Sequence, residues 1–296
     1  MRISERGMTR TILTDLMMNR SRLDRLHEQL SSGKRINRPS DDPGGTVTTM
    51  QINGALSELE QFRSNISLAA EWLNSTESVL AETSDVINRL RELSVRGATD
   101  TMSEAALGAT AEEVSEITDH LLSLANTKHV GRYIFAGYRT DAEPFSLGAT
   151  GFEYAGDHGA IMRQAGPGVE VQVNVPGDQG DGDGFFVDLL ETASRIRDGL
   201  FAGDTAAVND ELDALDRSGE DILAIRAQVG SRVNRLQMSE NRLEDMKISL
   251  TRTLSETADV DMAEALMELT LVERAYNVSL ATGARILPQT LLDYLR

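Results

Sequence analysis

The chain has 296 residues, no cysteine, a net charge of −18 at neutral pH, and only 4% aromatic residues. The missing cysteines exclude disulfides and thiolate metal sites, and the acidic balance argues against nucleic acid or an anionic membrane as a partner. No run of about 18 apolar residues is present, so the sequence predicts no membrane insertion. The N-terminus has arginines but no apolar core, which predicts no cleaved secretory signal.

The charge is spread unevenly along the chain. Residues 1–38 carry nine Arg and Lys residues against four acids, whereas residues 138–221 carry five against eighteen. This asymmetry has two readings. It is either head-to-tail complementarity in an assembly or a solvated surface that confers solubility, because exposed charges are screened by salt.

The first helical pattern spans residues 12–30. Its apolar side chains recur at alternating spacings of four and three, with Asn19 as the one polar residue in the seam, which is typical of a coiled coil. Burying five such side chains yields about 1.5–3 kcal/mol each, while ordering the backbone costs about 1–2 kcal/mol per residue. The helix therefore needs partners. Its seam residues are Ile12, Leu16, Leu23, Leu26 and Leu30.

A corner follows in the segment 30–43, LSSGKRINRPSDDP. A glycine at position 33 can adopt a positive φ and end the first helix, and Pro39 disfavours helix at the preceding residue. An aspartate at 41 or 42 can cap a second helix that has Pro43 in its first turn. On local chemistry alone the segment is either a plain helix–loop–helix corner or part of a larger motif. Its key residues are Gly33, Lys34, Arg35, Pro39, Asp41 and Asp42.

Residues 46–97 are expected to form one very long helix. Six apolar residues follow at a period of seven, which predicts a rod packed against other helices. A shorter helix is expected over residues 103–128. The six heptad residues of the long helix are Ile52, Leu59, Ile66, Leu73, Leu80 and Ile87.

Residues 131–186 differ in composition from the rest of the chain. They hold twelve of the 24 glycines and eight of the thirteen aromatic residues, and short strands are expected at 152–154, 161–164 and 169–175. The sequence therefore predicts a small β-rich insertion between helical halves. Its exit, GDQGDGDG, has two readings, a calcium loop using Asp178, Asp181 and Asp183 or a solvated turn. The missing EF-hand spacing favours the turn.

Helical patterns resume near Phe185 and become a heptad rod from Asp221 onward. A last helix is expected over about 259–286. It is apolar on more than one face, which suggests burial by several neighbours. The residues that we expect to form an assembly interface there are Leu266, Leu269, Val272, Tyr276 and Leu280.

No catalytic or cofactor-binding motif is present. The Gly-Lys pair in SSGKR lacks the upstream glycine and following Ser or Thr of a phosphate-binding loop, and no nucleophile elbow, HExxH or dinucleotide motif occurs. The four histidines, His27, His120, His129 and His158, are scattered and are expected at the surface. We predict no enzyme activity, cofactor or metal.

Three stretches of the sequence resemble the bacterial flagellin superfamily. The segment LSSGKRI and the stretch at 87–99, INRLRELSVRGAT, are similar to N-terminal flagellin motifs, and residues 259–296 resemble the flagellin C-terminus. The PSDDP ending of the corner, the opening MRIS and the stretch at 132–145, RYIFAGYRTDAEPF, resemble the hook–filament junction branch of that superfamily.

The resemblance implies a mainly α, flagellin-like fold of long coiled-coil-like rods in a chain that folds back on itself. Residues 1–35 and 255–296 would pair as a terminal coiled-coil domain, 36–137 and 185–254 would form a rod domain, and 138–184 would form a small outer β-rich domain. The segment 31–45 would be the spoke that connects the first two.

The resemblance also implies a structural adaptor that joins the hook to the filament as a ring of like subunits. Its partners would be another hook-associated protein, flagellin and a cytoplasmic export chaperone, and it would be exported without a cleaved signal to the extracellular flagellum. Two alternatives are a flagellin filament subunit and an unrelated secreted coiled-coil protein or enzyme with an unrecognised site.

Overall fold

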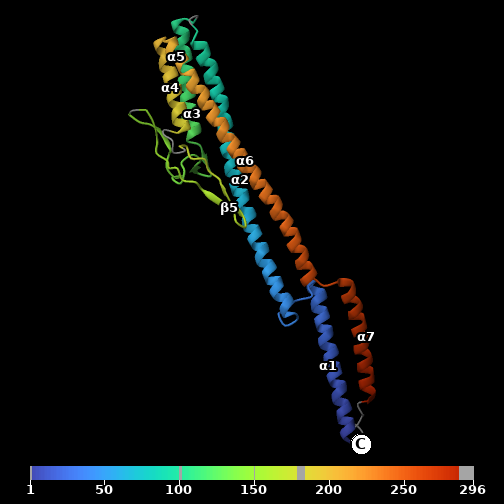
Figure 1. Ribbon diagram of the computed structural model, residues 1–296. Coiled ribbons are helices and arrows are strands. Elements are labelled where there is room, and N and C mark those ends of the chain that lie inside the picture. The colour runs from blue at the N-terminus through green and yellow to red at the C-terminus, as the bar shows by residue number, and fades with distance from the viewer. Residues whose placement is uncertain (1, 100–101, 150, 179–183, 287–296) are drawn as a thin grey trace. The chain divides into compact units, whose positions relative to one another are not determined.

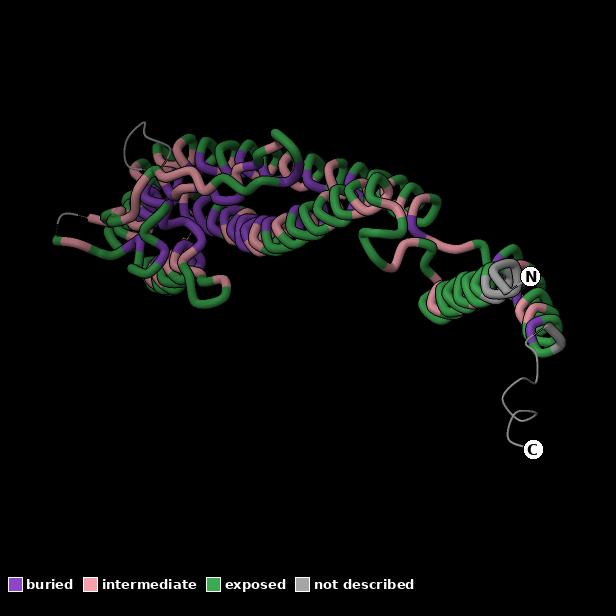
Figure 2. The backbone as a smooth tube through the Cα atoms, turned by 90° about the horizontal axis from the view of Figure 1, so that it is seen from below, coloured by how far each residue is buried: buried purple, intermediate pink, exposed green. Residues whose placement is uncertain are grey.

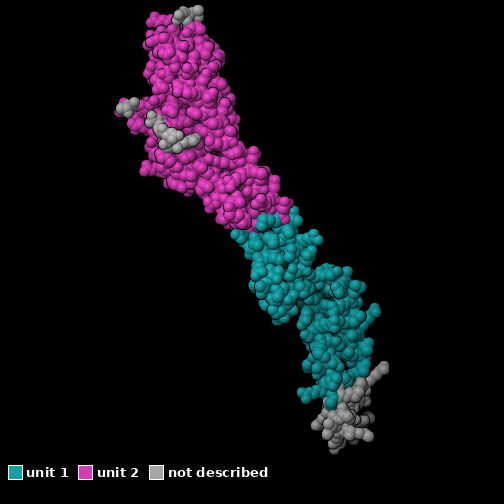
Figure 3. Space-filling model, in the orientation of Figure 1, with its two compact units in different colours: residues 1–58, 246–296 teal, residues 59–245 magenta. Residues whose placement is uncertain are grey.

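The computed structural model describes residues 2–99, 102–149, 151–178 and 184–286. Contacts divide the chain into two compact units, unit 1 with residues 1–58 and 246–296, and unit 2 with residues 59–245 (Figures 1 and 3). The helices are α1 (Arg2–Ser32), α2 (Pro43–Gly97), α3 (Glu104–Ala125), α4 (Phe185–Ala202), α5 (Thr205–Asp210), α6 (Leu212–Ala258) and α7 (Met262–Ile286). The strands are β1 (Lys128–His129), β2 (Arg132–Tyr133), β3 (Phe145–Leu147), β4 (Phe152–Tyr154), β5 (Met162–Gly166) and β6 (Val169–Gln172).

The predicted mainly α class with a small β-rich insertion is confirmed. The long helix expected over 46–97 is α2, and the rod expected from Asp221 is α6, which begins earlier at Leu212. The division into a terminal, a rod and an outer domain stays a prediction. No helix in the described ranges is both long and apolar enough to cross a membrane.

The core of unit 2 runs along α2 and α6, which lie antiparallel. Their direction follows from three ion pairs, along which residue numbers increase on α2 and decrease on α6. The pairs are Arg63–Glu244, Glu77–Arg226 and Arg91–Asp216. Along this stretch and one turn beyond it the heptad residues of both helices are buried, and Figure 2 shows buried positions recurring along the helices rather than covering them. These buried residues are Leu59, Ile66, Leu73, Leu80 and Ile87 on α2, and Ile222, Val229, Leu236 and Leu243 on α6.

The insertion consists of three antiparallel hairpins, β1–β2, β3–β4 and β5–β6, each a separate two-stranded sheet. Its core is an aromatic cluster in which Phe135 and Phe145 both meet Phe186 edge to face, with centroids 5.0 and 5.5 Å apart. The YIFAG stretch supplies this core, because Ile134 and Phe135 are fully buried. Gly137 ends the stretch with φ +67°, and a Cβ there would collide with the carbonyl oxygen of Asp157.

The last predicted strand, 169–175, is shorter than expected. β6 ends at Gln172, and beyond it the N–H of Val173 donates to the carbonyl oxygen of Ile161 at 2.9 Å before a side chain replaces the ladder. The fully buried Asn174 accepts a hydrogen bond from the backbone N–H of Ile161 at 2.7 Å and donates to the carbonyl oxygen of Gly159 at 2.6 Å. The alternating VEVQVNV pattern therefore continues as a buried segment that one backbone hydrogen bond and the Asn174 side chain hold to the chain at Ile161.

Two side chains from the rods hold the insertion through its backbone. The guanidinium of Arg232 on α6 donates to the carbonyl oxygen of Asn174 at 2.9 Å, and the amide of Asn65 on α2 donates to the carbonyl oxygen of Gln164 at 3.1 Å. Burial lowers the pKa of Arg232 from its ordinary value. The insertion is thus fixed against both long helices of unit 2.

Gly137→Ala should destabilise unit 2 more than Gly168→Ala. Both glycines have nearly the same positive φ, +67° and +68°, but the space around Gly168 is open. Left-handed strain alone costs about 1–2 kcal/mol at Gly168, and the added collision raises the loss at Gly137 to about 3 kcal/mol or more. Urea unfolding followed by fluorescence of Trp72, the single tryptophan, measures both. Equal losses would show that the Asp157 contact imposes no constraint.

Candidate assembly interface

The two terminal helices of unit 1, α1 and α7, lie side by side and run antiparallel (Figure 1). The predicted seam of α1 faces α7: Leu26 is buried, and the other four seam residues, Ile12, Leu16, Leu23 and Leu30, are half-buried. On α7, Val272 is buried and Leu269 and Tyr276 are half-buried. The structure therefore brings most of the predicted interface residues into one intramolecular seam.

Leu280 departs from this seam and is exposed, as is Leu266. The face of α7 that meets α1 continues through Ser279 and the buried Gly283 instead. A Cβ at Gly283 would lie 3.3 Å from Cγ2 of Ile12, so the glycine lets the two helices approach closely. The sequence pattern alone favoured Leu280, because a leucine fits a seam better than a serine or glycine.

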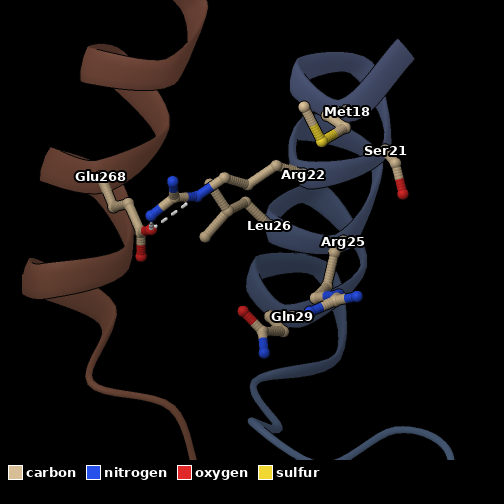
Figure 4. Close-up of a pocket in the computed structure, with 7 residues that line it drawn as sticks. All are labelled: Met18, Ser21, Arg22, Arg25, Leu26, Gln29 and Glu268. Atoms are coloured by element: carbon tan, nitrogen blue, oxygen red, sulfur yellow. Dashed lines mark hydrogen bonds and ion pairs between the residues drawn. The ribbon is translucent and has the colours of Figure 1, made fainter. Parts of the chain in front are cut away.

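A hollow of about 510 Å³ lies along the seam and is lined mainly by polar side chains of α1. Figure 4 shows Arg22 reaching across to Glu268 on α7, where its Nε donates to Oε1 at 3.0 Å. Both side chains are well exposed, and exposed pairs contribute about 0–1 kcal/mol. The pair therefore fixes the register of the helices more than it stabilises them.

The outer face of α7 carries a second apolar stripe. Met267, Leu271 and Val278 are spaced by four and seven residues, which places them on one face of the helix, and each is about two-thirds exposed. This face lies away from the buried Val272. Exposed apolar stripes of this kind mark protein contacts. In a single copy of the chain, α7 thus has one face covered by α1 and another that is uncovered.

The corner after α1 is tied to the junction between α6 and α7 by the backbone. The N–H of Arg35 donates to the carbonyl oxygen of Ala258 at 2.7 Å, and the N–H of Val260 donates to the carbonyl oxygen of Gly33 at 3.1 Å. Gly33 has φ +71°, as predicted, and turns the chain into this pairing. Two loops that are more than 220 residues apart in sequence therefore form one short antiparallel bridge.

Charged side chains of the corner strengthen the same contact. Lys34 pairs with Asp259, and a guanidinium nitrogen of Arg35 donates to the carbonyl oxygen of Thr257 at 2.6 Å. The Lys34 ammonium holds the pKa of the Asp259 carboxyl below its ordinary value of 3.8. The basic residues that the sequence places at the end of α1 thus bind the C-terminal half of the chain.

The acidic residues of the corner organise its turn and start α2. Asp41 accepts the backbone N–H of Arg38 at 2.9 Å, and Asp42 accepts that of Gly45 at 2.9 Å. Of the two predicted helix caps, Asp42 therefore serves. The Gly45 N–H, with a further contribution from Arg35, holds the pKa of Asp42 below its ordinary value of 3.8. Pro39 is exposed and lies in the turn between Arg38 and Asp41.

The described residues hold no group of three or more His, Asp or Glu side chains that could bind a metal ion. Asp178 lies in the described part of the chain, whereas Asp181 and Asp183 of the alternative calcium loop lie outside it. Three of the four histidines are exposed and His129 is half-buried.

Gly33→Val should loosen the bridge between the corner and the α6–α7 junction. A Cβ at Gly33 meets nothing within 4 Å, so the cost is backbone strain alone, about 1–2 kcal/mol. Hydrogen exchange at the Val260 amide should then speed up about tenfold. Gly33→Asn is the matched control, because Asn tolerates this conformation better and should exchange at close to the wild-type rate. Unchanged exchange in the valine variant would contradict this account of the corner.

Comparison with known proteins extends the resemblance to most of the chain. Residues 3–140 match the family model of the bacterial flagellin N-terminal helical region, and residues 212–295 match that of the C-terminal helical region. Together the two matches cover well over half of the sequence.

Individual relatives align over nearly their whole lengths. Flagellar hook-associated protein 3 of Escherichia coli is 26% identical over 93% of this chain and 95% of its own, and that of Salmonella typhimurium is 25% identical over 95% and 96%. The flagellin of Bacillus subtilis is 29% identical over 100% of both chains.

Solved structures share the fold. A putative flagellar hook-associated protein from Vibrio parahaemolyticus superposes with a TM-score of 0.68, at 20% identity, over 74% of this chain and all of its own. Bacillus cereus FlgL gives 0.61, at 23% identity, over 69% and 99%. With both helical regions matched in order and the terminal helices paired as a folded-back chain, the protein belongs to the bacterial flagellin family.

Proposed function

We propose that this chain is the structural adaptor that joins the flagellar hook to the flagellin filament. The observation that carries the proposal is the end-to-end match to hook-associated protein 3 from two bacteria. The PSDDP ending of the corner and the YIFAG stretch support the same assignment, because both resemble the hook–filament junction branch.

The adaptor role is one of assembly rather than catalysis. We infer that copies of the chain associate into a ring through unit 1, with the outer stripe of α7 covered by neighbouring copies. The exposed Leu266 and Leu280, on another side of α7, would contribute a separate contact. Another hook-associated protein on one side, flagellin on the other and a cytoplasmic export chaperone complete the proposed partners. The proposed location is the extracellular flagellum at the hook–filament boundary.

A filament subunit is the second candidate, and the full-length match to Bacillus subtilis flagellin favours it. The two roles differ in where the protein accumulates. A junction adaptor occupies one short zone at the base of each filament, whereas a filament subunit fills the whole filament.

A fluorescent label distinguishes the two roles. Leu147→Cys places a thiol on the exposed β3 strand of the insertion in a chain that otherwise has none, so a maleimide dye labels one position. In the flagellated host we expect one spot per flagellum at the hook–filament boundary by light microscopy. Label along the entire filament would instead assign the chain as flagellin. No label in flagella would contradict both roles.

Leu271→Ser should impair assembly without unfolding the chain. Leu271 is 68% exposed on the outer face of α7, so its loss leaves the α1–α7 seam intact. Burial of such a side chain contributes about 1.5–3 kcal/mol to each contact between copies. Losing that free energy should reduce the number of filaments at least about tenfold. Electron microscopy should show hooks without filaments. Leu68→Ser, at a 57% exposed position of α2, is the matched control and should keep normal filaments.

A further inference from the structure

The β1–β2 hairpin of unit 2 presents an unusual turn. Val130 and Gly131 connect the strands with φ +49° and +79°, and Val130 is 87% exposed. Two-residue hairpin turns with positive φ at both positions favour Asn-Gly, and a β-branched residue in this conformation is strained. Strain of this kind, at a fully solvated apolar side chain, is a basis for inferring a function.

The rest of the hairpin holds this tip in place. His129 meets Trp72 of α2 edge to face with centroids 5.6 Å apart, and Nζ of Lys128 lies 4.4 Å from the centroid of the Tyr133 ring. Lys128 and Arg132, on either side of the turn, are exposed. The tip is therefore a rigid apolar knob between two cations.

A groove with the complementary character lies between α2 and α6 in the same unit. Its volume is about 450 Å³, with the buried Ile87 and Leu215 at its floor and Leu223, 58% exposed, at its side. A Cβ at Gly219 would lie 3.7 Å from Cγ2 of Ile87, so the glycine leaves this part of the groove open. Arg91 and Asp216, which are paired with each other, and Glu220 also line it.

We propose that the Val130 tip of one copy docks in this groove of a second copy. Val130 would cover Leu223, and the cations beside it would face Glu220, since Asp216 is already paired with Arg91. This inference rests on the proposed self-assembly and adds a second contact to it, one that involves unit 2.

The occupant is another copy rather than the same chain. Trp72, which anchors the hairpin, and Ile87, at the groove floor, are fifteen residues apart on one unbroken helix, or about 22 Å at 1.5 Å per residue. A chain's own tip is thus held away from its own groove. A contact between two different surfaces is heterologous, so it can repeat around a ring. A contact this small is weak alone and acts where assembly supplies a high local concentration.

Cysteine cross-linking between two variants tests the contact in assembled flagella. Val130→Cys and Leu223→Cys are co-expressed in the flagellated host, incorporation of both is verified by immunoblot, and isolated flagella are oxidised with copper–phenanthroline. The sequence has no other cysteine. We expect disulfide-linked dimers to form at least about tenfold faster than with Val130→Cys and Met238→Cys. Met238 is the matched control because it is 65% exposed on the same helix, α6. Equal rates would overturn the proposal.

Val130→Asn separates this role from a purely structural one. Asn suits the turn, so the variant should unfold at the same or a higher temperature than the wild type, yet tip-to-groove contact should weaken. With Lys128→Cys and Leu223→Cys as the cross-linking pair, adding Val130→Asn should slow dimer formation several-fold. Unchanged cross-linking would show that Val130 has no part in docking.

The two proposals can fail separately. A labelled chain at the junction without tip-to-groove cross-links removes only the docking contact. Cross-links in a chain that labels whole filaments keep the contact and remove the junction assignment.

Discussion

The backbone bridge between the corner and the α6–α7 junction is the contact on which the rest of unit 1 depends. It comprises the two hydrogen bonds that join Gly33 and Arg35 to Val260 and Ala258, with Lys34 and Asp259 paired beside them. Because it fixes where α1 ends and where α7 begins, it sets the register in which the terminal helices meet. Gly33 makes the bridge possible, since its left-handed conformation directs the next residues toward the other loop.

Packing differs in kind between the two units. Unit 2 buries the heptad residues of two long helices together with an aromatic cluster, as in an ordinary globular core. In unit 1, α1 and α7 share one narrow seam and leave much apolar surface uncovered. A helix pair of this type gains little free energy by itself, because ordering its backbone offsets most of the gain from one seam. This imbalance is the physical basis for placing assembly at unit 1.

The sequence was informative where a regular period or a special backbone conformation left a clear pattern. The heptads of α2 and α6, the positive φ of Gly33 and a helix cap at Asp41 or Asp42 were all predicted. The β1–β2 hairpin was not, because two-residue strands have no readable period and Val130-Gly131 lacks the usual turn residues. The place of Gly283 in the terminal seam was missed for a related reason, since a glycine contributes by allowing close approach rather than by apolar surface. The hydrogen bonds to Asn174 could not be predicted, because they depend on contacts between residues that are distant in sequence.

The way in which the insertion is anchored has an evolutionary consequence. Arg232 and Asn65 both bind main-chain carbonyl oxygens, those of Asn174 and Gln164, and Arg232 adds a longer hydrogen bond to Oε1 of Gln172 at 3.3 Å. A carbonyl oxygen is present at every position, so most side chains of the β5–β6 hairpin are free to change while the attachment persists. The surface of the insertion can therefore change without altering the long helices to which it is attached.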